Sequence, residues 1–208
     1  MIHNTINIKK GFNINISGAP QKTISDYHST TYAISPLDFI YYPPIPKIFG
    51  EIGQNVLAGE PLFCDKNNEE MVITSPVSGE SISINRGEKR AINSIVLLAD
   101  SVIEYKKFNI LSNNCTRQNI IDLLLESGCW LYFKQRPYNV IANPLVIPKA
   151  IYISCFDTTP LSVDLELVIK GNEHYFQSGI SALKRLTHYV HLGINSQLSN
   201  STFTQFQN

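Results

Sequence analysis

Apolar and polar residues alternate along much of the first hundred positions, with glycine and proline between the alternating runs. Residues 6–20 alternate on both sides of Lys9-Lys10-Gly11, as the two strands of a hairpin do. Residues 71–96 hold two further β-rich runs, one on each side of a bend at Gly87. This pattern predicts a β module over residues 1–100.

The β-rich region contains an internal repeat. Each copy is a strand, a glycine turn and a second strand that ends in an apolar pair. An offset of 34 residues aligns Ile48 with Ile82, Gly53 with Gly87 and Leu62 with Val96. Two such copies can pack face to face, because each covers the apolar side that the other cannot bury alone. We therefore expect a β sandwich.

Helical periodicity replaces the alternation after Asp100. The run from Arg117 to Leu125 predicts a helix, with N-cap candidates before it and Gly128 as its end. A short helical turn is expected over residues 130–133, and Pro137 ends it. With further prolines at positions 144 and 148, residues 101–149 are expected to form a helical and extended connector.

The last third of the chain predicts a parallel crossover unit. Residues 150–156 are nearly all apolar, as expected of a strand buried on both faces of a parallel sheet. Residues 172–186 predict a helix with Phe176 and Ile180 on its apolar stripe, and residues 189–194 predict a second strand.

We therefore expect an α+β chain in which residues 150–194 form the first part of an α/β domain and residues 195–208 form a polar tail. Two parallel strands and one helix cannot cover both faces of a sheet. The chain is accordingly expected to be a fragment of a longer protein, or a shortened member of a family of longer proteins.

Composition narrows the class of function. The 208 residues carry 17 basic and 17 acidic side chains, and 43% are hydrophobic. This is a globular composition, and it lacks the clustered positive charge with which proteins bind nucleic acid or an anionic membrane. The longest apolar runs are far shorter than the roughly 20 residues of a membrane-spanning helix. The alternating N-terminus lacks the apolar region of a secretion signal, which favours the cytoplasm.

Neither the cysteines nor the histidines form a recognisable metal site. The four cysteines are scattered, with no Cys-x-x-Cys pair, so zinc and iron–sulfur sites are not expected. His188 and His191 have no third ligand nearby in the sequence. We therefore expect no metal, no catalytic residue and no cofactor-binding residue.

Three features are candidate ligand sites, and each has a structural alternative. Aromatic and basic residues cluster over residues 130–138, where Trp130, Arg136 and Tyr138 could hold a planar ring such as a quinone or could simply pack and solvate the connector. Asp157 follows an apolar strand, at the sheet end where ligands bind in open parallel sheets, or it caps the next turn. Around Gly87, basic side chains could contact an anion or a partner, or lie on a solvated turn.

Lys66 is a fourth candidate, because its surroundings resemble those of a lipoyl-carrier lysine. In that pattern a lysine at a hairpin tip is followed by a Pro-x-Ser/Ala-Gly turn, here Pro76-Val77-Ser78-Gly79. Lys66 lies ten residues before Pro76, about two more than in the pattern. The alternatives are a modified carrier lysine and a plain surface lysine.

The order of several short motifs resembles the A subunit of the sodium-translocating NADH:quinone oxidoreductase. These motifs are Ile8-Lys9-Lys10-Gly11, Ser17-Gly18-Ala19-Pro20, Gly59-Glu60-Pro61-Leu62-Phe63, Thr74-Ser75-Pro76-Val77-Ser78-Gly79, Asn85-Arg86-Gly87-Glu88-Lys89-Arg90, Ser127-Gly128-Cys129-Trp130, Lys134-Gln135-Arg136-Pro137-Tyr138 and Asp157-Thr158-Thr159-Pro160. Their order and approximate spacing agree up to Gly193.

The resemblance implies a barrel-sandwich hybrid module, lipoyl/biotinyl-like in fold, followed by a Rossmann-like α/β domain. It implies a peripheral subunit on the cytoplasmic side of the bacterial inner membrane, in a complex that passes electrons from NADH to ubiquinone and moves sodium. NADH and flavins belong to partner subunits, and quinone binding is associated with the contact to the membrane-embedded B subunit. The C subunit of the related Rnf electron-transport complex shares the architecture, and a scaffold of that kind is, beside the Lys66 carrier, a second alternative to the quinone-reductase subunit.

The resulting hypothesis is a subunit that docks to its partners and helps to shape a quinone pocket. The candidate quinone contacts are Trp130, Arg136, Tyr138 and Asp157. No covalently bound cofactor is expected on this chain. A carrier modified at Lys66 is the alternative from another class.

Overall fold

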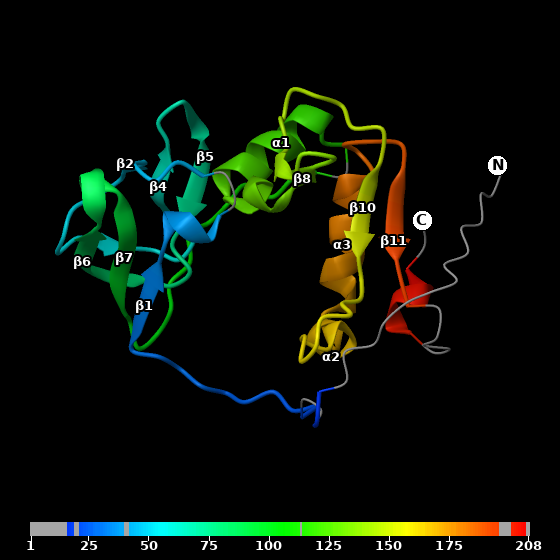
Figure 1. Cartoon of the computed structure of the whole chain (residues 1–208). Coiled ribbons are helices and arrows are strands. Elements are labelled where there is room, and N and C mark those ends of the chain that lie inside the picture. The colour runs from blue at the N-terminus through cyan, green and yellow to red at the C-terminus, as the bar shows by residue number, and fades with distance from the viewer. Residues whose placement is uncertain (1–15, 19–20, 40–41, 113, 196–200, 207–208) are drawn as a thin grey trace.

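The computed structural model describes residues 16–18, 21–39, 42–112, 114–195 and 201–206 (Figure 1). Most of the hairpin that the sequence predicts over residues 6–20 lies outside the described residues.

The N-terminal half forms two small antiparallel sheets that pack on each other. The first has the order β1-β7-β6-β3, with strands Thr31–Ile34, Ile92–Ala99, Gly79–Arg86 and Asn55–Val56. The second has the order β2-β4-β5, with strands Lys47–Ile48, Pro61–Asp65 and Asn68–Thr74. Two 3-10 turns, η1 Pro36–Asp38 and η2 Glu88–Arg90, complete this β module.

The internal repeat is confirmed as a pair of strands in each sheet. In the first copy β2 pairs with β4, and Ile48 lies opposite Phe63. In the second copy β6 pairs with β7, and Ile84 lies opposite Ile95. Side chains of both copies, including Leu62, Phe63, Ile95 and Leu97, are buried together in one apolar core. The two copies therefore bury each other's apolar sides, as the repeat predicts.

Gly79 shows why the turn before β6 requires glycine. Its φ is +151°, and a Cβ atom at this position would overlap the backbone carbonyl oxygen of Leu98 on β7. Only a residue without a side chain permits this close approach of two strands.

The connector begins with a helix and ends in a hairpin. Helix α1 spans Arg117–Glu126, and Thr116 caps it by accepting a hydrogen bond from the backbone N–H of Asn119. Gly128 follows with φ of +74°, so it ends the helix as predicted. The helical turn expected over residues 130–133 is confirmed as η3, Cys129–Tyr132. Strands β8 Lys134–Gln135 and β9 Val140–Ile141 then form a short hairpin that the sequence pattern did not predict.

The last third contains the predicted crossover unit. Strand β10, Ile151–Ser154, pairs in parallel with β11, Val190–Gly193. Helix α3, Glu173–Leu183, packs Phe176 and Ile180 against one face of this pair, and a shorter helix, α2 Leu165–Ile169, precedes it. The sequence pattern missed α2.

Two expectations about this unit are corrected. The prediction that residues 150–156 are buried on both faces is wrong in this structure, because β10 alternates and Tyr152 is 78% exposed. The segment predicted to be a polar tail contains the 3-10 turn η4, Thr202–Gln205, whose Phe203 packs with Phe206 against Phe176. Two aromatic side chains in a polar stretch pack this turn against α3, and Ser201 and Thr202 add hydrogen bonds to Glu166.

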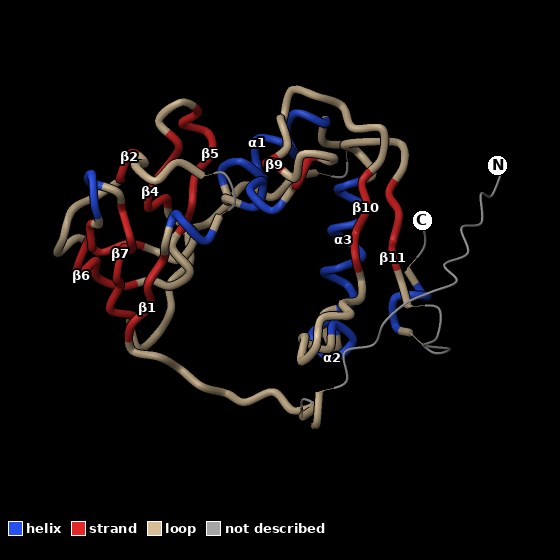
Figure 2. Tube along the Cα trace, viewed as in Figure 1, coloured by secondary structure: helices blue, strands red, loops and turns tan. Residues whose placement is uncertain are grey.

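The crossover unit and the β module lie on opposite sides of α1 (Figure 1). Leu186, which follows α3, is buried in the same apolar core as residues of α1, η3 and the β module. The Arg185 guanidinium also donates to the backbone carbonyl of Cys115, at 2.8 Å. A long loop leads into β1 (Figure 2), and its Lys22 forms an ion pair with Asp164 at the start of α2, at 3.1 Å.

Candidate functional site

Trp130 lies in the core rather than on a ligand-facing surface. Its side chain is 5% exposed, and its ring centroid is 5.1 Å from that of Phe133. The indole N–H donates to the backbone carbonyl of Ala142 at 2.7 Å, so the polar atom of the ring is satisfied within the protein. The structure therefore gives Trp130 the packing role that the sequence offered as its alternative.

Arg136 and Tyr138 lie together on the turn between β8 and β9, and both are exposed. Tyr138 is 74% exposed. The ammonium group of the nearby Lys134 is already engaged within the protein, because it donates to the carbonyl of Leu131 at 2.9 Å. Burial lowers the pKa of Lys134. Of the aromatic and basic cluster, Tyr132 on η3 is 73% exposed, and Arg136 and Tyr138 are the exposed members on the β8–β9 turn.

Asp157 stands just beyond the end of β10, as the sequence predicts, but its side chain is engaged locally. Its carboxylate accepts hydrogen bonds from the backbone N–H of Thr159 at 2.8 Å and from the Thr159 hydroxyl at 2.6 Å. These hydrogen bonds lower the pKa of Asp157. Asp157 therefore caps its turn and lies in the crossover unit, apart from the β8–β9 hairpin that carries Arg136 and Tyr138.

Lys66 is exposed in the tight turn that joins β4 to β5. The turn is held by Asp65, whose side chain accepts a hydrogen bond from the backbone N–H of Asn67 at 2.8 Å. The structure thus places Lys66 at a hairpin tip, the position that the carrier pattern requires.

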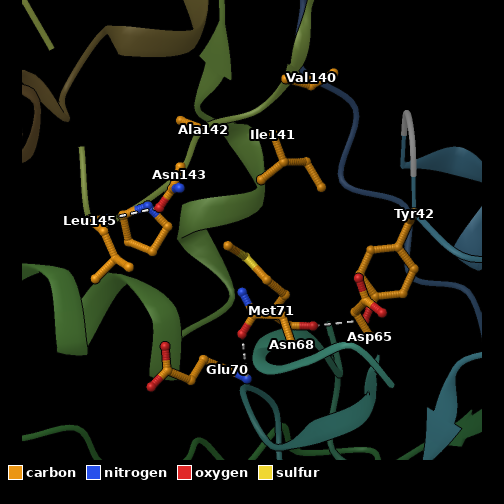
Figure 3. Close-up of a pocket in the computed structure, with 11 residues that line it drawn as sticks. Tyr42, Asp65, Asn68, Glu70, Met71, Val140, Ile141, Ala142, Asn143 and Leu145 are labelled. Atoms are coloured by element: carbon orange, nitrogen blue, oxygen red, sulfur yellow. Dashed lines mark hydrogen bonds between the residues drawn. The ribbon is translucent and has the colours of Figure 1, made fainter. Parts of the chain in front are cut away.

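A pocket of about 540 Å³ opens between the β4–β5 hairpin and the chain that leaves β9. We call it the hairpin pocket; its lining is drawn in Figure 3. One wall comprises Tyr42, Asp65, Asn68, Glu70 and Met71, and the other comprises residues 140–145. No sequence motif pointed to this pocket, because its walls are about 70 residues apart in the chain.

The charged groups of the hairpin pocket are both acidic, namely Asp65 and Glu70. Tyr42 has its hydroxyl turned to the protein: it donates to the carbonyl of Met71 at 2.8 Å. Burial, with the nearby Cys64 and Asp65, raises the pKa of Tyr42, so the phenol stays neutral. The remaining surface is largely apolar, from Met71 and from the side chains of residues 140–145.

The described residues contain no group of three or more His, Cys, Asp or Glu side chains that could hold a metal ion. Within the same ranges, no helix has the length and apolar character needed to cross a membrane.

Comparisons with known proteins identify both halves of the chain. Residues 6–100 match the family model of the NqrA N-terminal barrel-sandwich hybrid domain, and residues 115–208 match that of the NqrA second alpha/beta domain. These matches confirm the expected fold class, a barrel-sandwich hybrid followed by an α/β domain.

Curated relatives agree with the two domain matches. The chain is 32% identical, over 96% of its length, to a protein of Photorhabdus laumondii that is named as the A subunit of the Na(+)-translocating NADH-quinone reductase. It is 34% identical, over 92% of its length, to the protein of the same name from Tolumonas auensis. The matched regions cover 47% and 44% of those relatives, so the chain spans about half of their length.

Proposed function

The chain belongs to the NqrA family, the A subunits of the Na(+)-translocating NADH-quinone reductase, and on that premise we propose that it acts as a subunit of such a complex. The complex passes electrons from NADH to ubiquinone and couples this transfer to sodium transport. The observation that carries the proposal is the match of both described halves, in the same order, to the first two domains of one family.

In this proposal the chain docks and positions, and partner subunits carry out the redox chemistry. NADH and the flavins are bound by those partners, and this chain holds no covalent cofactor. It lies on the cytoplasmic side of the bacterial inner membrane, where it contacts the membrane-embedded B subunit of the complex.

Co-purification from membranes tests this assembly. A tagged form of the chain, expressed from its own locus, is expected to bring down the B subunit from solubilised membranes together with NADH:quinone reductase activity that rises with sodium. Deletion of the gene is expected to abolish that activity. If the tagged chain purifies without membrane proteins and the deletion leaves the sodium-stimulated activity unchanged, the proposal is wrong.

We further propose that Arg136 and Tyr138 contribute to quinone binding, at a site completed by the partner subunit. Both side chains are exposed on the turn of one hairpin. Trp130 of η3 is buried in the core, and its hydrogen bond to the carbonyl of Ala142 holds the end of that hairpin in place. A guanidinium group can donate to a quinone carbonyl oxygen, and a phenol ring can stack on a planar ring. Asp157, engaged by Thr159 in the other unit, is left out of this site.

Alanine substitution of Arg136 is expected to raise the KM for quinone about 10-fold in the assembled complex, because one charge-assisted hydrogen bond to the ligand is lost. The KM for NADH is expected to stay the same. Arg86→Ala, which removes an exposed arginine from β6, is the matched control and is expected to change neither constant. An unchanged quinone KM in a doubly substituted Arg136→Ala, Tyr138→Ala complex would contradict the proposal.

One observation keeps the carrier alternative open: Lys66 lies at an exposed hairpin tip. Attachment of lipoate would join its activated carboxyl carbon to the Lys66 side-chain nitrogen as an amide, with release of the activating group and of a proton from the amine, and would remove the positive charge. Intact mass after expression in a lipoylating host decides between the two functions, since a mass equal to that of the unmodified sequence excludes the carrier.

A further inference from the structure

The hairpin pocket presents two carboxylates, and none of the described basic side chains lines it. Asp65 and Glu70 both come from the β4–β5 hairpin, and within the described part of the chain neither forms an ion pair. Lys66, the residue next to Asp65, is not part of the lining. An unpaired pair of acids at the mouth of a pocket favours a cationic group in it.

Exposed apolar side chains continue from the pocket along the wall opposite these acids. Leu145, which lines the pocket, is 86% exposed, and the next two residues, Val146 and Ile147, are also exposed. Their backbone is held in place, because the Arg117 guanidinium donates to the carbonyl of Val146 at 3.2 Å and to that of Pro144 at 3.3 Å. An apolar segment fixed in this way, beside an acidic pocket, has the composition of an interaction surface.

The occupant has to cover more than the pocket itself. A small molecule bound in a pocket usually has 70–90% of its surface buried, whereas here Glu70, Asn143 and Leu145 of the lining are all exposed. A quinone is also disfavoured, since its carbonyl oxygens would face the carboxylates of Asp65 and Glu70. A protein segment can fill the pocket with one side chain and cover Leu145 to Ile147 with its neighbours.

We propose that the hairpin pocket docks a basic segment of a partner subunit, with an arginine or lysine side chain between Asp65 and Glu70 and flanking apolar residues on Leu145 to Ile147. The proposal rests on the function proposed above only for the source of that segment, namely another subunit of the same complex. The recognition itself depends on the pocket.

Peptide binding to the full chain tests the recognition directly. The probe is acetyl-Leu-Arg-Leu-amide, and its neutral counterpart replaces arginine with citrulline, which has nearly the same shape without the charge. NMR titration is expected to show the arginine peptide shifting the amide signals of Asn68, Glu70 and Asn143 and binding at least 10-fold more tightly than the citrulline peptide. Raising the salt concentration is expected to weaken only the charged probe.

Isosteric variants locate the charge. Asp65→Asn and Glu70→Gln keep the shape of the side chains, and the double variant is expected to bind the arginine peptide at least 10-fold more weakly, with its other amide signals unchanged. Glu88→Gln on η2, outside the pocket, is the matched control. Leu145→Ser, at an exposed position, is expected to weaken both peptides equally.

Three results would overturn the proposal: equal affinity for the two peptides, no binding of either, or full binding by the double variant. Co-purification of the chain with membrane subunits tests the proposed function separately. If the peptide binds as expected but the chain does not join the complex, the pocket is still a docking site for basic segments and the function proposed above is wrong. If the chain joins the complex and the peptide does not bind, only the docking proposal fails.

Discussion

Single residues divide into those whose role could be inferred locally and those whose role depends on distant neighbours. Gly128 was predicted to end a helix, and Asp157 had a turn cap as its local alternative; both act within a few residues of their own position. Trp130 is different, because an aromatic residue beside cations has the same local sequence in a ligand pocket and in a core. Its hydrogen bond to Ala142, twelve residues away, decided the matter.

Substitution of Trp130 by Phe is expected to lower the free energy of unfolding by about 1–3 kcal/mol, because the carbonyl of Ala142 loses its donor. Urea denaturation followed by far-UV circular dichroism measures the change. Tyr132→Phe, at an exposed ring in the same turn, is the control and is expected to change the free energy by less than about 0.5 kcal/mol. Equal effects of the two substitutions would show that Trp130 is not a core residue.

Among the secondary-structure elements, the long periodic ones could be predicted and the short ones could not. Helices α1 and α3 and strands β10 and β11 lie close to their predicted ranges, because each has an apolar stripe or run of its own. Strands β8 and β9 have two residues each, and α2 has five, too few for a period. Turn η4 was missed for another reason: Phe203 and Phe206 stand alone in a polar stretch and are buried only because Phe176 on α3 faces them.

The attachment of η4 is expected to depend on pH through Glu166. Partial burial raises the pKa of this carboxyl, but hydrogen bonds from Ser201 and Thr202 outweigh the burial, so the pKa is lowered overall. A lowered pKa in the folded protein means that the stabilisation is present above the ordinary pKa of about 4.3 and is lost as the pH falls through the lowered value.

NMR can follow this titration at the amide of Thr202, which donates to Glu166 at 2.9 Å. Its chemical shift is expected to move with a midpoint below about 4.3, the ordinary glutamate value. In Glu166→Gln the same amide is expected to show no such titration. A midpoint at or above the ordinary value, or an identical curve in the variant, would contradict the assignment.

At the scale of the whole molecule, the β module and the crossover unit share part of one core. Leu186 belongs in sequence to the end of the crossover helix, yet it is 3% exposed within the core that contains Trp130 and α1. Two arginines add hydrogen bonds around α1. Arg185, beyond α3, donates to the carbonyl of Cys115 just before α1, and Arg117 on α1 donates to the carbonyl of Val146. The crossover unit and the core around α1 and Trp130 are therefore expected to unfold together.

Truncation of Leu186 to Ala tests this coupling. The substitution is expected to cost about 2–5 kcal/mol, because it leaves a cavity in the core that Leu186 shares with α1 and Trp130. Trp130 is the sole tryptophan of the chain and lies on η3 in the core that also contains Leu186, so its fluorescence reports on that core although the substitution lies beyond α3. Its unfolding midpoint is expected to fall in Leu186→Ala and to stay unchanged in Leu161→Ala, at a position 62% exposed. An unchanged midpoint in both variants would show that the crossover unit unfolds independently of the core around Trp130.

The sequence by itself determined the order of the elements and, through a series of short motifs, the family. Both depend on local information: glycine and proline at turns, apolar periods within each element, and motif spacing along the chain. The internal repeat aligned Ile48 with Ile82, and the strands that carry them, β2 and β6, each pair with another strand of the same copy, β4 and β7.

Only the tertiary structure decided which side chains meet. The β4–β5 hairpin carries Asp65 and Glu70, and the chain after β9 carries Leu145; no periodic pattern connects positions so far apart. A pocket is the space left where separate elements pack, so its shape and charge follow from contacts that the linear order does not contain. For the same reason Trp130, the most prominent ligand candidate in the sequence, lies in the core, and the acidic pocket lies where no motif pointed.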